Sequence, residues 1–399
     1  MKTLLKNIVS TLGNFFFHLK TKNALPVYVK KILVISLYFR GDVLFNTASI
    51  KILKKIYPEA KIDVMVKSRS SEVLHENPDI NKLIVFDDIK TADYNDCTEI
   101  KLNEKFSLLK KIRKERYDIC ADLTGKYTTA LIALFGNFKY SFGLNYNGFG
   151  FCYTKFVNSD TQNSKGHLSD KYSDVVKEGL NIDEEIWSDL NKNIYGKCFI
   201  LISESEKKEA GIIIDNLGID TERPLICLQT TAGWSAKEWD ETNYSGLLNK
   251  FMLSGYSYVL VGSDSDRERN FRILDTLSGE HRKYFLSLPL KINAAIIGHS
   301  DLFIGSDSIG LHLAGALNVP SIGLFGPTNP AFSNPRGDIH KVIYNKLSCS
   351  ASEDEQYCTR NAGKSCMTLD CLKDISADEV FKEAEVLLSV KFHRKGISA

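Results

Sequence analysis

Residues 301–328, DLFIGSDSIGLHLAGALNVPSIGLFGPT, decide the fold class of this chain. Two short apolar runs, 302–305 and 321–325, have the length and composition of buried strands. A polar turn and a stretch of small apolar residues lie between them, and the spacing predicts a helix over 312–317. A strand, a helix and a second strand in this order predict a βαβ unit with parallel strands.

The same alternation extends outward from this stretch. In the second half of the chain, strands are predicted at 225–229 and 258–261, and helices at 243–254, 266–277 and 291–298. In the first half, strands are predicted at 31–37, 62–66, 82–86 and 118–122, and helices at 43–56 and 106–116. The pattern is weak over 136–170, which is rich in Gly, Asn, Tyr and Phe. Two such series fit a chain of 399 residues.

We therefore expect an α/β protein with two Rossmann-like domains that face each other across a cleft. The expected parts are an N-terminal segment (1–25), a first domain (26–190) and a second domain (200–390), with the boundary in the polar stretch 181–197. In such sheets ligands bind beyond the carboxyl ends of the strands. The loops that follow the predicted strands are therefore the candidate functional sites.

The polar turn within 301–328 is the first candidate. Asp307, Ser308, Gly310 and His312 follow the predicted strand 302–305. The amides and the dipole of a helix N-terminus favour phosphate groups, so this turn is a candidate diphosphate site. His312 alone is better explained as a buried structural histidine. A second donor-rich loop after the next strand favours ligand binding instead.

The loop after the predicted strand 225–229 carries hydroxyls and a cation. Its sequence TTAGWSAKEW includes Thr230, Thr231 and Lys237. Hydroxyl and amide donors beside a lysine can bind phosphate, although this loop is not a Walker sequence. Trp239 is expected to pack in the core.

In the first domain, the turn after the predicted strand 31–37 contains Arg40, Gly41 and Asp42. Asp42 could cap the following helix through its backbone amides, which is the simpler interpretation of an isolated Gly-Asp pair. Alternatively, it could act as a general base that deprotonates an acceptor hydroxyl.

Together these segments resemble glycosyltransferase family 9, the heptosyltransferases of lipopolysaccharide core assembly. In the first half the resemblance rests on ILVISLYFRGDVLFNTASIKILKKIYPEAKIDVMV and ENPDINKLIVFD. In the second half it rests on LQTTAGWSAKEW and GSDSIGLHLAGALNVPSIGLFGPTNP. It covers roughly residues 30–390, with the motifs in the expected order.

The resemblance implies a GT-B fold with an N-terminal acceptor domain and a C-terminal donor domain. It implies an inverting reaction that needs no bound metal. By the same resemblance Asp42 is the general base and Lys237 pairs with the donor phosphates. The residues that would surround the nucleotide-sugar are Asp307, Ser308 and His312, with Asp266 near the ribose.

Several positions depart from the family pattern. Ile309 stands where a glycine is usual, and Thr230-Thr231 replaces Pro-Gly. Gln229 replaces a histidine and Ala48 a proline. The residues with catalytic character are kept, so we expect activity. The departures leave the identity of the donor sugar open.

The resemblance predicts a transferase that moves a sugar onto a lipopolysaccharide-core or other surface-glycan acceptor. By family expectation the sugar is heptose and its donor is ADP-heptose. The acceptor is expected to be lipid-linked or an oligosaccharide. Two alternatives stay open. One is a nucleotide-sugar hydrolase or epimerase on the same scaffold. The other is a catalytically inactive homologue that only binds nucleotide-sugar.

The net charge limits the possible partners, and the cysteines indicate the compartment. Lys and Arg total 51 and Asp and Glu 49, so the net charge of +2 gives no reason to expect nucleic acid. The nine cysteines and the lack of a secretory signal favour a reducing, cytoplasmic compartment. Four of them cluster near the C-terminus and could hold a structural zinc, form disulfides or remain separate thiols: Cys349, Cys358, Cys366 and Cys371.

The N-terminal segment is basic and apolar at helical spacing, and no acidic residue precedes Asp42. It is too short and too interrupted to span a bilayer. It could form a helix on the inner face of the cytoplasmic membrane, or a helix packed on the protein; the sequence favours neither.

Overall fold

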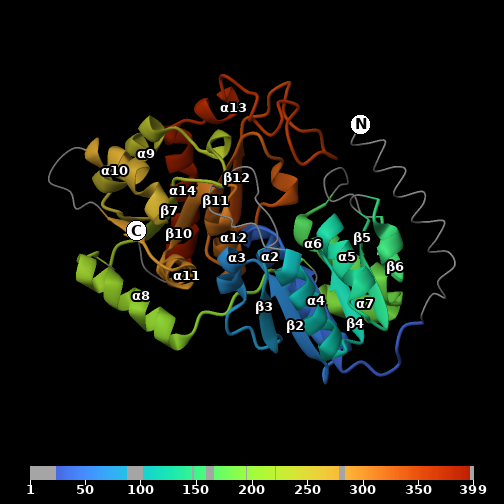
Figure 1. Cartoon of the computed structure of the whole chain (residues 1–399). Helices are drawn as coiled ribbons and strands as arrows, with labels where there is room; N and C mark the ends of the chain where they lie inside the picture. The colour runs from blue at the N-terminus through green and yellow to red at the C-terminus, as the bar shows by residue number, and fades with distance from the viewer. Residues whose placement is uncertain are drawn as a thin grey trace. The chain divides into compact units, whose positions relative to one another are not determined.

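The computed structural model describes residues 24–87, 102–145, 148–158, 166–194, 196–220, 222–277 and 284–395. The chain divides into two compact units, whose elements are labelled in Figure 1. Unit 1 contains Met1–Ser164 and Leu168–Leu201, and unit 2 contains Lys165–His167 and Ile202–Ala399. The N-terminal segment 1–23 and Cys97 lie outside the described residues.

Unit 1 is built on a six-stranded sheet in the order β3-β2-β1-β4-β5-β6. Every pairing is parallel. The strands are β1 (Lys31–Ser36), β2 (Lys61–Val66), β3 (Lys82–Val85), β4 (Ile119–Asp122), β5 (Tyr140–Leu144) and β6 (Lys155–Val157). β1 and β4 are almost entirely buried, because helices cover both faces of a parallel sheet.

The helices of unit 1 connect these strands. They are α2 (Arg40–Ile56), α3 (Ser68–Ser71), η1 (Glu72–Leu74), α4 (Leu102–Glu115), α5 (Tyr127–Phe135), η2 (Gly150–Cys152), α6 (Leu168–Leu180) and α7 (Glu184–Asn193). Successive side chains of a strand point to opposite faces. Leu33 and Ile35 of β1 share one core cluster with Ile112 of α4 and Ala130 of α5, so α4 and α5 cover the same face.

Unit 2 repeats this architecture. Its sheet has the order β12-β11-β10-β7-β8-β9, again parallel throughout. Counted from β9, this is the strand order of unit 1. The strands are β7 (Leu225–Gln229), β8 (Ser257–Gly262), β9 (Phe285–Ser287), β10 (Leu302–Ser306), β11 (Ser321–Phe325) and β12 (His340–Tyr344).

The helices of unit 2 also alternate with its strands, and the last one completes the core. They are α8 (Glu204–Leu217), η3 (Ser235–Lys237), α9 (Glu241–Leu253), η4 (Asp264–Asp266), α10 (Arg267–Asp275), α11 (Leu290–His299), α12 (Ile309–Ala316), η5 (Pro330–Phe332), α13 (Asp370–Lys373) and α14 (Ala377–Lys395). Val380 and Ala384 of α14 pack with Phe251 of α9. Trp239 lies in the same cluster, which confirms the expectation that it packs in the core.

Each strand predicted from the sequence is present, and so is the expected α/β class. The weak stretch 136–170 contains β5 and β6, which the sequence pattern did not reveal. The polar stretch 181–197, where the boundary was expected, contains α7, and the two units divide at Leu201 and Ile202. α12 begins at Ile309, so His312 lies inside the helix rather than at its start.

The strand order of each sheet reverses direction between two central strands. In unit 1 this point lies between β1 and β4, and in unit 2 between β7 and β10. The carboxyl ends of strands at such a point are the usual ligand site of this architecture. Among the described residues, no helix is long and apolar enough to cross a bilayer.

Candidate functional site

A nearly buried ion pair lies at this point in unit 2. Lys237 ends η3 in the loop after β7, and Asp307 directly follows β10. The Lys237 Nζ lies 3.2 Å from Asp307 Oδ2, and each side chain is only 10% exposed. Nζ also donates to the backbone carbonyl of Asp307. Lys237 therefore joins the loop after β7 to the loop after β10, which the sequence analysis had singled out separately.

The other carboxylate oxygen of Asp307 is also engaged. Ser333 donates its hydroxyl to Oδ1 at 2.8 Å, and His312 Nε2 lies 3.6 Å from the same atom. Burial alone would raise the pKa of Asp307, but the Lys237 charge and the Ser333 hydrogen bond outweigh it and hold that pKa at about 2. Asp307 is therefore a carboxylate at neutral pH.

His312 is buried on α12 next to this pair. Burial lowers its pKa to about 4, against the opposing influence of Asp307. The imidazole is therefore neutral at pH 7, and the Lys237–Asp307 pair sets the local charge. The site brings Asp307 and His312 together as the sequence predicted, and adds Ser333, which no sequence motif indicated.

The N-terminus of α12 is partly occupied by a side chain of the chain itself. Gln229 Oε1 accepts hydrogen bonds from the Gly310 amide at 3.0 Å and from the Ser308 hydroxyl at 3.1 Å. A Cβ at Gly310 would lie 2.3 Å from the same oxygen, so the close approach requires glycine. Gln229 thus fixes the start of the helix, and the Gly310 amide is not directed at an open space.

A tryptophan brings the C-terminal loop onto this site. Lys237 Nζ lies 4.1 Å from the ring centroid of Trp234, and Lys364 Nζ lies 5.7 Å from it. The Trp234 Nε1 donates to the carbonyl of Ala362 at 3.0 Å. Gly363 has φ +80°, and a Cβ there would lie 2.9 Å from Ala236. Two lysines from distant parts of the chain therefore share one indole ring.

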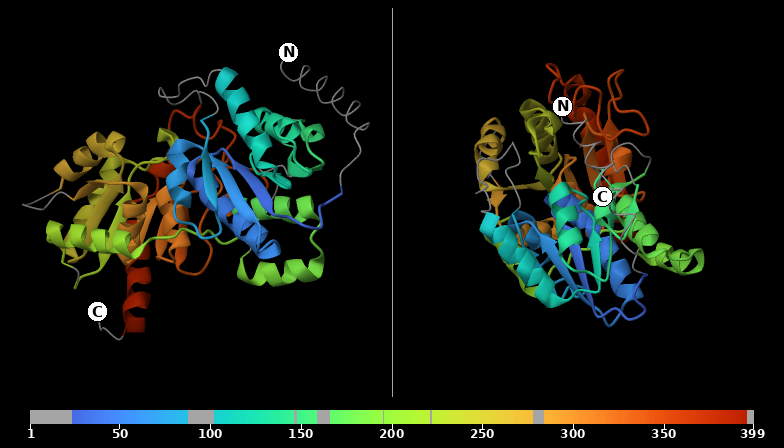
Figure 2. Two further views of the ribbon diagram at one scale, coloured as in Figure 1. Left: turned by 60° about the horizontal axis from the view of Figure 1, so that its bottom comes forward. Right: turned by 45° about the vertical axis from the view of Figure 1, so that its right-hand side comes forward.

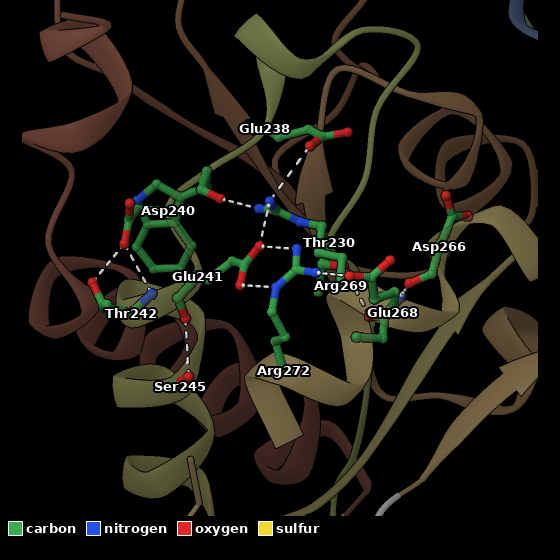
Figure 3. Close-up of polar contacts among 12 residues, drawn as sticks. Thr230, Glu238, Asp240, Glu241, Thr242, Ser245, Asp266, Glu268, Arg269 and Arg272 are labelled. Atoms are coloured by element: carbon green, nitrogen blue, oxygen red, sulfur yellow. Dashed lines mark hydrogen bonds and ion pairs between the residues drawn. The ribbon is translucent and has the colours of Figure 1, made fainter. Parts of the chain in front are cut away.

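A second network of hydrogen bonds and ion pairs, drawn in Figure 3, holds the loop after β7 in place. Arg269 donates to the carbonyl of Trp239 at 2.5 Å and pairs with Glu241 at 3.1 Å and Glu238 at 3.5 Å. Glu238 in turn accepts from the Ala232 amide at 3.2 Å. This network fixes both ends of the segment that carries Lys237.

Thr230 and Asp266 belong to the edge of this network. The Thr230 hydroxyl donates to Asn270 Oδ1 at 2.8 Å, and Asn270 Nδ2 donates to the Asp266 carbonyl at 2.8 Å. The Asp266 carboxylate accepts from the Ser263 amide and hydroxyl, both at 2.7 Å. Asp266 therefore stabilises its own turn, and Thr231 is buried beside Thr230.

Asp42 lies in unit 1, in the first turn of α2, whose N-cap is Phe39. The expectation that Asp42 precedes and caps the helix is therefore wrong: the helix begins at Arg40, two residues earlier. Instead, Tyr172 of α6 donates its hydroxyl to Asp42 Oδ1 at 3.0 Å. Negative charge in the first turn is favoured by the helix dipole.

The turn that carries Asp42 is tied to the turn after β4. Thr124 Oγ1 accepts from the Leu37 amide at 2.8 Å, and the Thr124 carbonyl accepts from the Tyr38 hydroxyl at 2.8 Å. Asp122 accepts from the Thr124 amide at 2.8 Å and from Tyr153 at 2.7 Å. The two central loops of the unit 1 sheet therefore form one hydrogen-bonded edge.

The C-terminal cysteines Cys349, Cys358, Cys366 and Cys371 are free thiols. Within the described ranges, no group of three His, Cys, Asp or Glu side chains is placed to hold a metal ion. The Cys366 sulfur accepts hydrogen bonds from the Leu369 and Thr368 amides, which lower the pKa of that thiol. The earlier cysteines Cys120, Cys152 and Cys227 are buried thiols, and Cys198 is a half-buried one.

Two Rossmann-like units with the same parallel strand order are the architecture of the GT-B fold. Solved structures share it: glycosyl transferase family 9 from Veillonella parvula has a TM-score of 0.76 at 24% identity, covering 92% of this chain and 99% of that one. ADP-heptose lps heptosyltransferase II from E. coli has a TM-score of 0.72 at 24% identity, covering 90% and 99%.

The sequence comparisons identify the family. The model of glycosyltransferase family 9 (heptosyltransferase) matches residues 105–362. Lipopolysaccharide heptosyltransferase 3 from Escherichia coli is 28% identical over 302 residues, which cover 74% of this chain and 84% of that protein. The chain belongs to glycosyltransferase family 9 and is a glycosyltransferase of the heptosyltransferase type.

Proposed function

We propose that this enzyme transfers heptose from ADP-heptose, with inversion at the anomeric carbon, onto a lipopolysaccharide-core or other surface-glycan acceptor. Unit 2 binds the donor and unit 1 the acceptor. The observation that carries this proposal is the Lys237–Asp307 pair at the strand reversal of unit 2. The E. coli structural relative carries ADP-heptose in its name, which supports the choice of donor.

The donor diphosphate is bound by Lys237 and the start of α12. An ammonium group has three protons. Asp307 accepts from Nζ with its carbonyl and its carboxylate, which orients the lysine without removing its charge. The Thr231 hydroxyl and the remaining first-turn amides add donors, whereas the Thr230 and Ser308 hydroxyls already donate to Asn270 and Gln229 and hold the two loops in place. Neutral His312 can donate or accept a single hydrogen bond to the nucleotide-sugar.

Asp42 is the general base of the transfer. It takes the proton of the acceptor hydroxyl while that oxygen forms a bond to the anomeric carbon. The bond between this carbon and the diphosphate oxygen breaks on the opposite face, so the configuration inverts. General base catalysis contributes on the order of 10²–10⁴ in rate.

The departing ADP carries the electron pair of the broken bond. Lys237 and the α12 dipole stabilise the negative charge that develops on its phosphate oxygen. In this mechanism the cation is supplied by the protein, so a divalent metal is not required. Transfer should therefore continue in excess EDTA.

We place the reaction in the cytoplasm, at the inner face of the membrane that holds lipid-linked acceptors. The basic and apolar character of residues 1–25 supports peripheral association. Removing residues 1–24 should lower sedimentation with anionic vesicles; unchanged sedimentation would exclude a membrane role for this segment.

The first test is calorimetry of ADP-heptose, ADP and the UDP and GDP sugars with wild type, Lys237→Ala and Asp42→Asn. We expect ADP-heptose to bind wild type and Asp42→Asn alike and Lys237→Ala at least tenfold more weakly. Asp42→Asn should lose transfer to a heptose-deficient lipopolysaccharide acceptor. If wild type binds a different nucleotide-sugar and not ADP-heptose, the proposed donor is wrong. Full transfer by Asp42→Asn would exclude Asp42 as the general base.

A further inference from the structure

Helix α5 exposes an apolar face that the core does not use. Tyr127, Leu131 and Phe135 are 48%, 39% and 55% exposed. Their spacing of four residues places them on one side of the helix. Ala130 and Ala133, on the other side, are buried in the core. Contiguous exposed apolar patches on a protein mark interaction sites, whereas single exposed apolar residues need no explanation.

Helix α4 adds positive charge beside this face. Phe106 is 63% exposed, and Lys110, Arg113 and Lys114 follow it at spacings that keep them on the same side. Glu115, at the end of α4, is already paired with Lys31 at 2.8 Å. Within the part of the chain that the structure describes, no carboxylate pairs with these three cations.

The two helices cover the same face of the unit 1 sheet. Ile112 of α4 and Ala130 of α5 pack into one core cluster on one face of the unit 1 sheet. The outward sides of both helices therefore belong to one surface of unit 1, which can be followed in Figures 1 and 2. This α4–α5 surface consists of Phe106, Lys110, Arg113, Lys114, Tyr127, Leu131 and Phe135.

We propose that the α4–α5 surface docks on an anionic lipid bilayer. Aromatic and aliphatic side chains enter the boundary between head groups and acyl chains, while lysine and arginine pair with lipid phosphates. Each cation near an anionic membrane strengthens binding by roughly fivefold. A bilayer offers apolar and negatively charged partners together, which is the complement of this surface.

A second copy of the chain is a poorer partner. A symmetric dimer brings the same patch of both subunits together. Lys110, Arg113 and Lys114 of one subunit would then face the same cations of the other. Charge complementarity therefore selects the bilayer, and self-association becomes an outcome of the test.

The α4–α5 surface adjoins the turn that carries Asp42. Tyr127 begins α5 three residues after Thr124, whose Oγ1 accepts from the Leu37 amide at 2.8 Å. Lys126, between them, lies over the Tyr38 ring at 5.4 Å. A lipid-linked acceptor could thus present its sugar to unit 1 from the bilayer. This step rests on the proposed function, whereas vesicle binding itself does not.

The test compares full-length variants on phosphatidylethanolamine–phosphatidylglycerol vesicles and on phosphatidylcholine vesicles. One variant carries Lys110→Gln, Arg113→Gln and Lys114→Gln, and another carries Tyr127→Ser, Leu131→Ser and Phe135→Ser. The control carries Lys208→Gln, Lys346→Gln and Lys382→Gln, which removes three exposed lysines of unit 2. All variants keep residues 1–23, so the contribution of that segment cancels.

We expect both surface variants to bind anionic vesicles at least tenfold more weakly than wild type, and the control to match wild type. The binding of the charge variant should also depend less steeply on salt concentration than that of wild type. Wild-type binding by the charge variant, or equal wild-type binding to phosphatidylcholine, would overturn the proposal. So would a concentration-dependent dimer that both surface variants abolish.

A transfer assay separates this proposal from the proposed function. With a delipidated, water-soluble acceptor the charge variant should match wild type, and with the acceptor embedded in vesicles its rate should fall at least fivefold. A wild type that transfers to neither acceptor would contradict the proposed function and leave the vesicle result standing. Unchanged thermal unfolding of the variants checks that they fold.

Discussion

Tyr172 donates its hydroxyl proton to Asp42 Oδ1 at 3.0 Å, although the two residues are 130 positions apart. Tyr172 is buried on α6, and Asp42 lies in the first turn of α2. A hydrogen bond to a carboxylate fixes the direction of its lone pairs as well as its position. Tyr172 is therefore a positioning residue for the proposed base.

Tyr172→Phe should lower kcat about tenfold and leave the KM for the donor unchanged. A hydrogen bond to a charged group stabilises the folded protein by about 1.5–3 kcal/mol. A loss of about 1.4 kcal/mol of this in the transition state lowers kcat tenfold. The matched control is Tyr140→Phe, which removes a buried hydroxyl bonded to the Gly179 carbonyl, also on α6. An equal loss of kcat in both variants would show that Tyr172 acts only through the stability of unit 1.

Lys237→Met should destabilise unit 2 by about 3–5 kcal/mol, because it leaves the Asp307 carboxylate buried without its cation. Adding Asp307→Leu should restore most of the stability but not ADP binding. Urea unfolding followed by tryptophan fluorescence in a Trp187→Phe background reports unit 2 alone, since Trp234 and Trp239 belong to that unit. A double variant that binds ADP normally would contradict the phosphate role of Lys237.

Unit 2 should lose stability as the pH falls from about 6.5 towards 4. Burial lowers the pKa of both His312 and His340 to about 4, from an ordinary value of 6.5. Between pH 6.5 and pH 4 the unfolded state takes up protons that the folded state excludes. The contribution of each histidine to stability is therefore complete above about pH 6.5 and is lost progressively as the pH falls towards 4. Below pH 3.8, Asp307 adds a further loss, because its folded pKa is held at about 2.

In His340→Gln one histidine fewer takes up a proton on unfolding. The slope of the unfolding free energy against pH should therefore fall by up to about 1.4 kcal/mol per pH unit. His340 bonds Ser321 at 2.8 Å, away from the Lys237–Asp307 pair, so ADP affinity should remain. The measurement is urea unfolding at intervals between pH 7 and pH 4. The same slope in wild type and His340→Gln would contradict the assignment.

Gly310→Ala should weaken ADP binding and destabilise unit 2. The new methyl group would lie 2.3 Å from Gln229 Oε1 and 2.7 Å from Phe303, so the cap of α12 must move. Gly298→Ala in α11 is the control, because its nearest neighbour would lie 3.9 Å away. Alanine there should stabilise the helix by about 0.5–1 kcal/mol. Normal ADP affinity in Gly310→Ala would exclude the α12 start from the donor site.

The buried strands could be predicted because their sequences satisfy one local requirement. Residues 32–35 and 302–305 are apolar throughout, since both faces of a parallel sheet are covered. β6, with three residues, and β5, which contains Ser141 and Gly143, lack this signal. The predicted helix starts differ from the observed ones by one to four residues, because backbone geometry rather than side-chain periodicity sets them.

The candidate site was predictable only where its residues stand in local motifs. Lys237 and Asp307 could be singled out in their own loops, but their contact joins positions 70 residues apart. Tyr172, Ser333 and Arg269 carry no local pattern, because tertiary packing alone places them. The Ala362 carbonyl that accepts from Trp234 is backbone, and any residue type could supply it.

That last hydrogen bond has a consequence for biosynthesis. The loop around Trp234 reaches its final arrangement only when Ala362 and Gly363 pack against it. α14, which completes the core of unit 2, follows later still. Unit 1 can fold while the ribosome is still extending the chain, since domains fold as units during synthesis. The proposed donor site is therefore complete only after α14 has been synthesised, and nascent chains that end before this helix should be unable to bind the nucleotide-sugar.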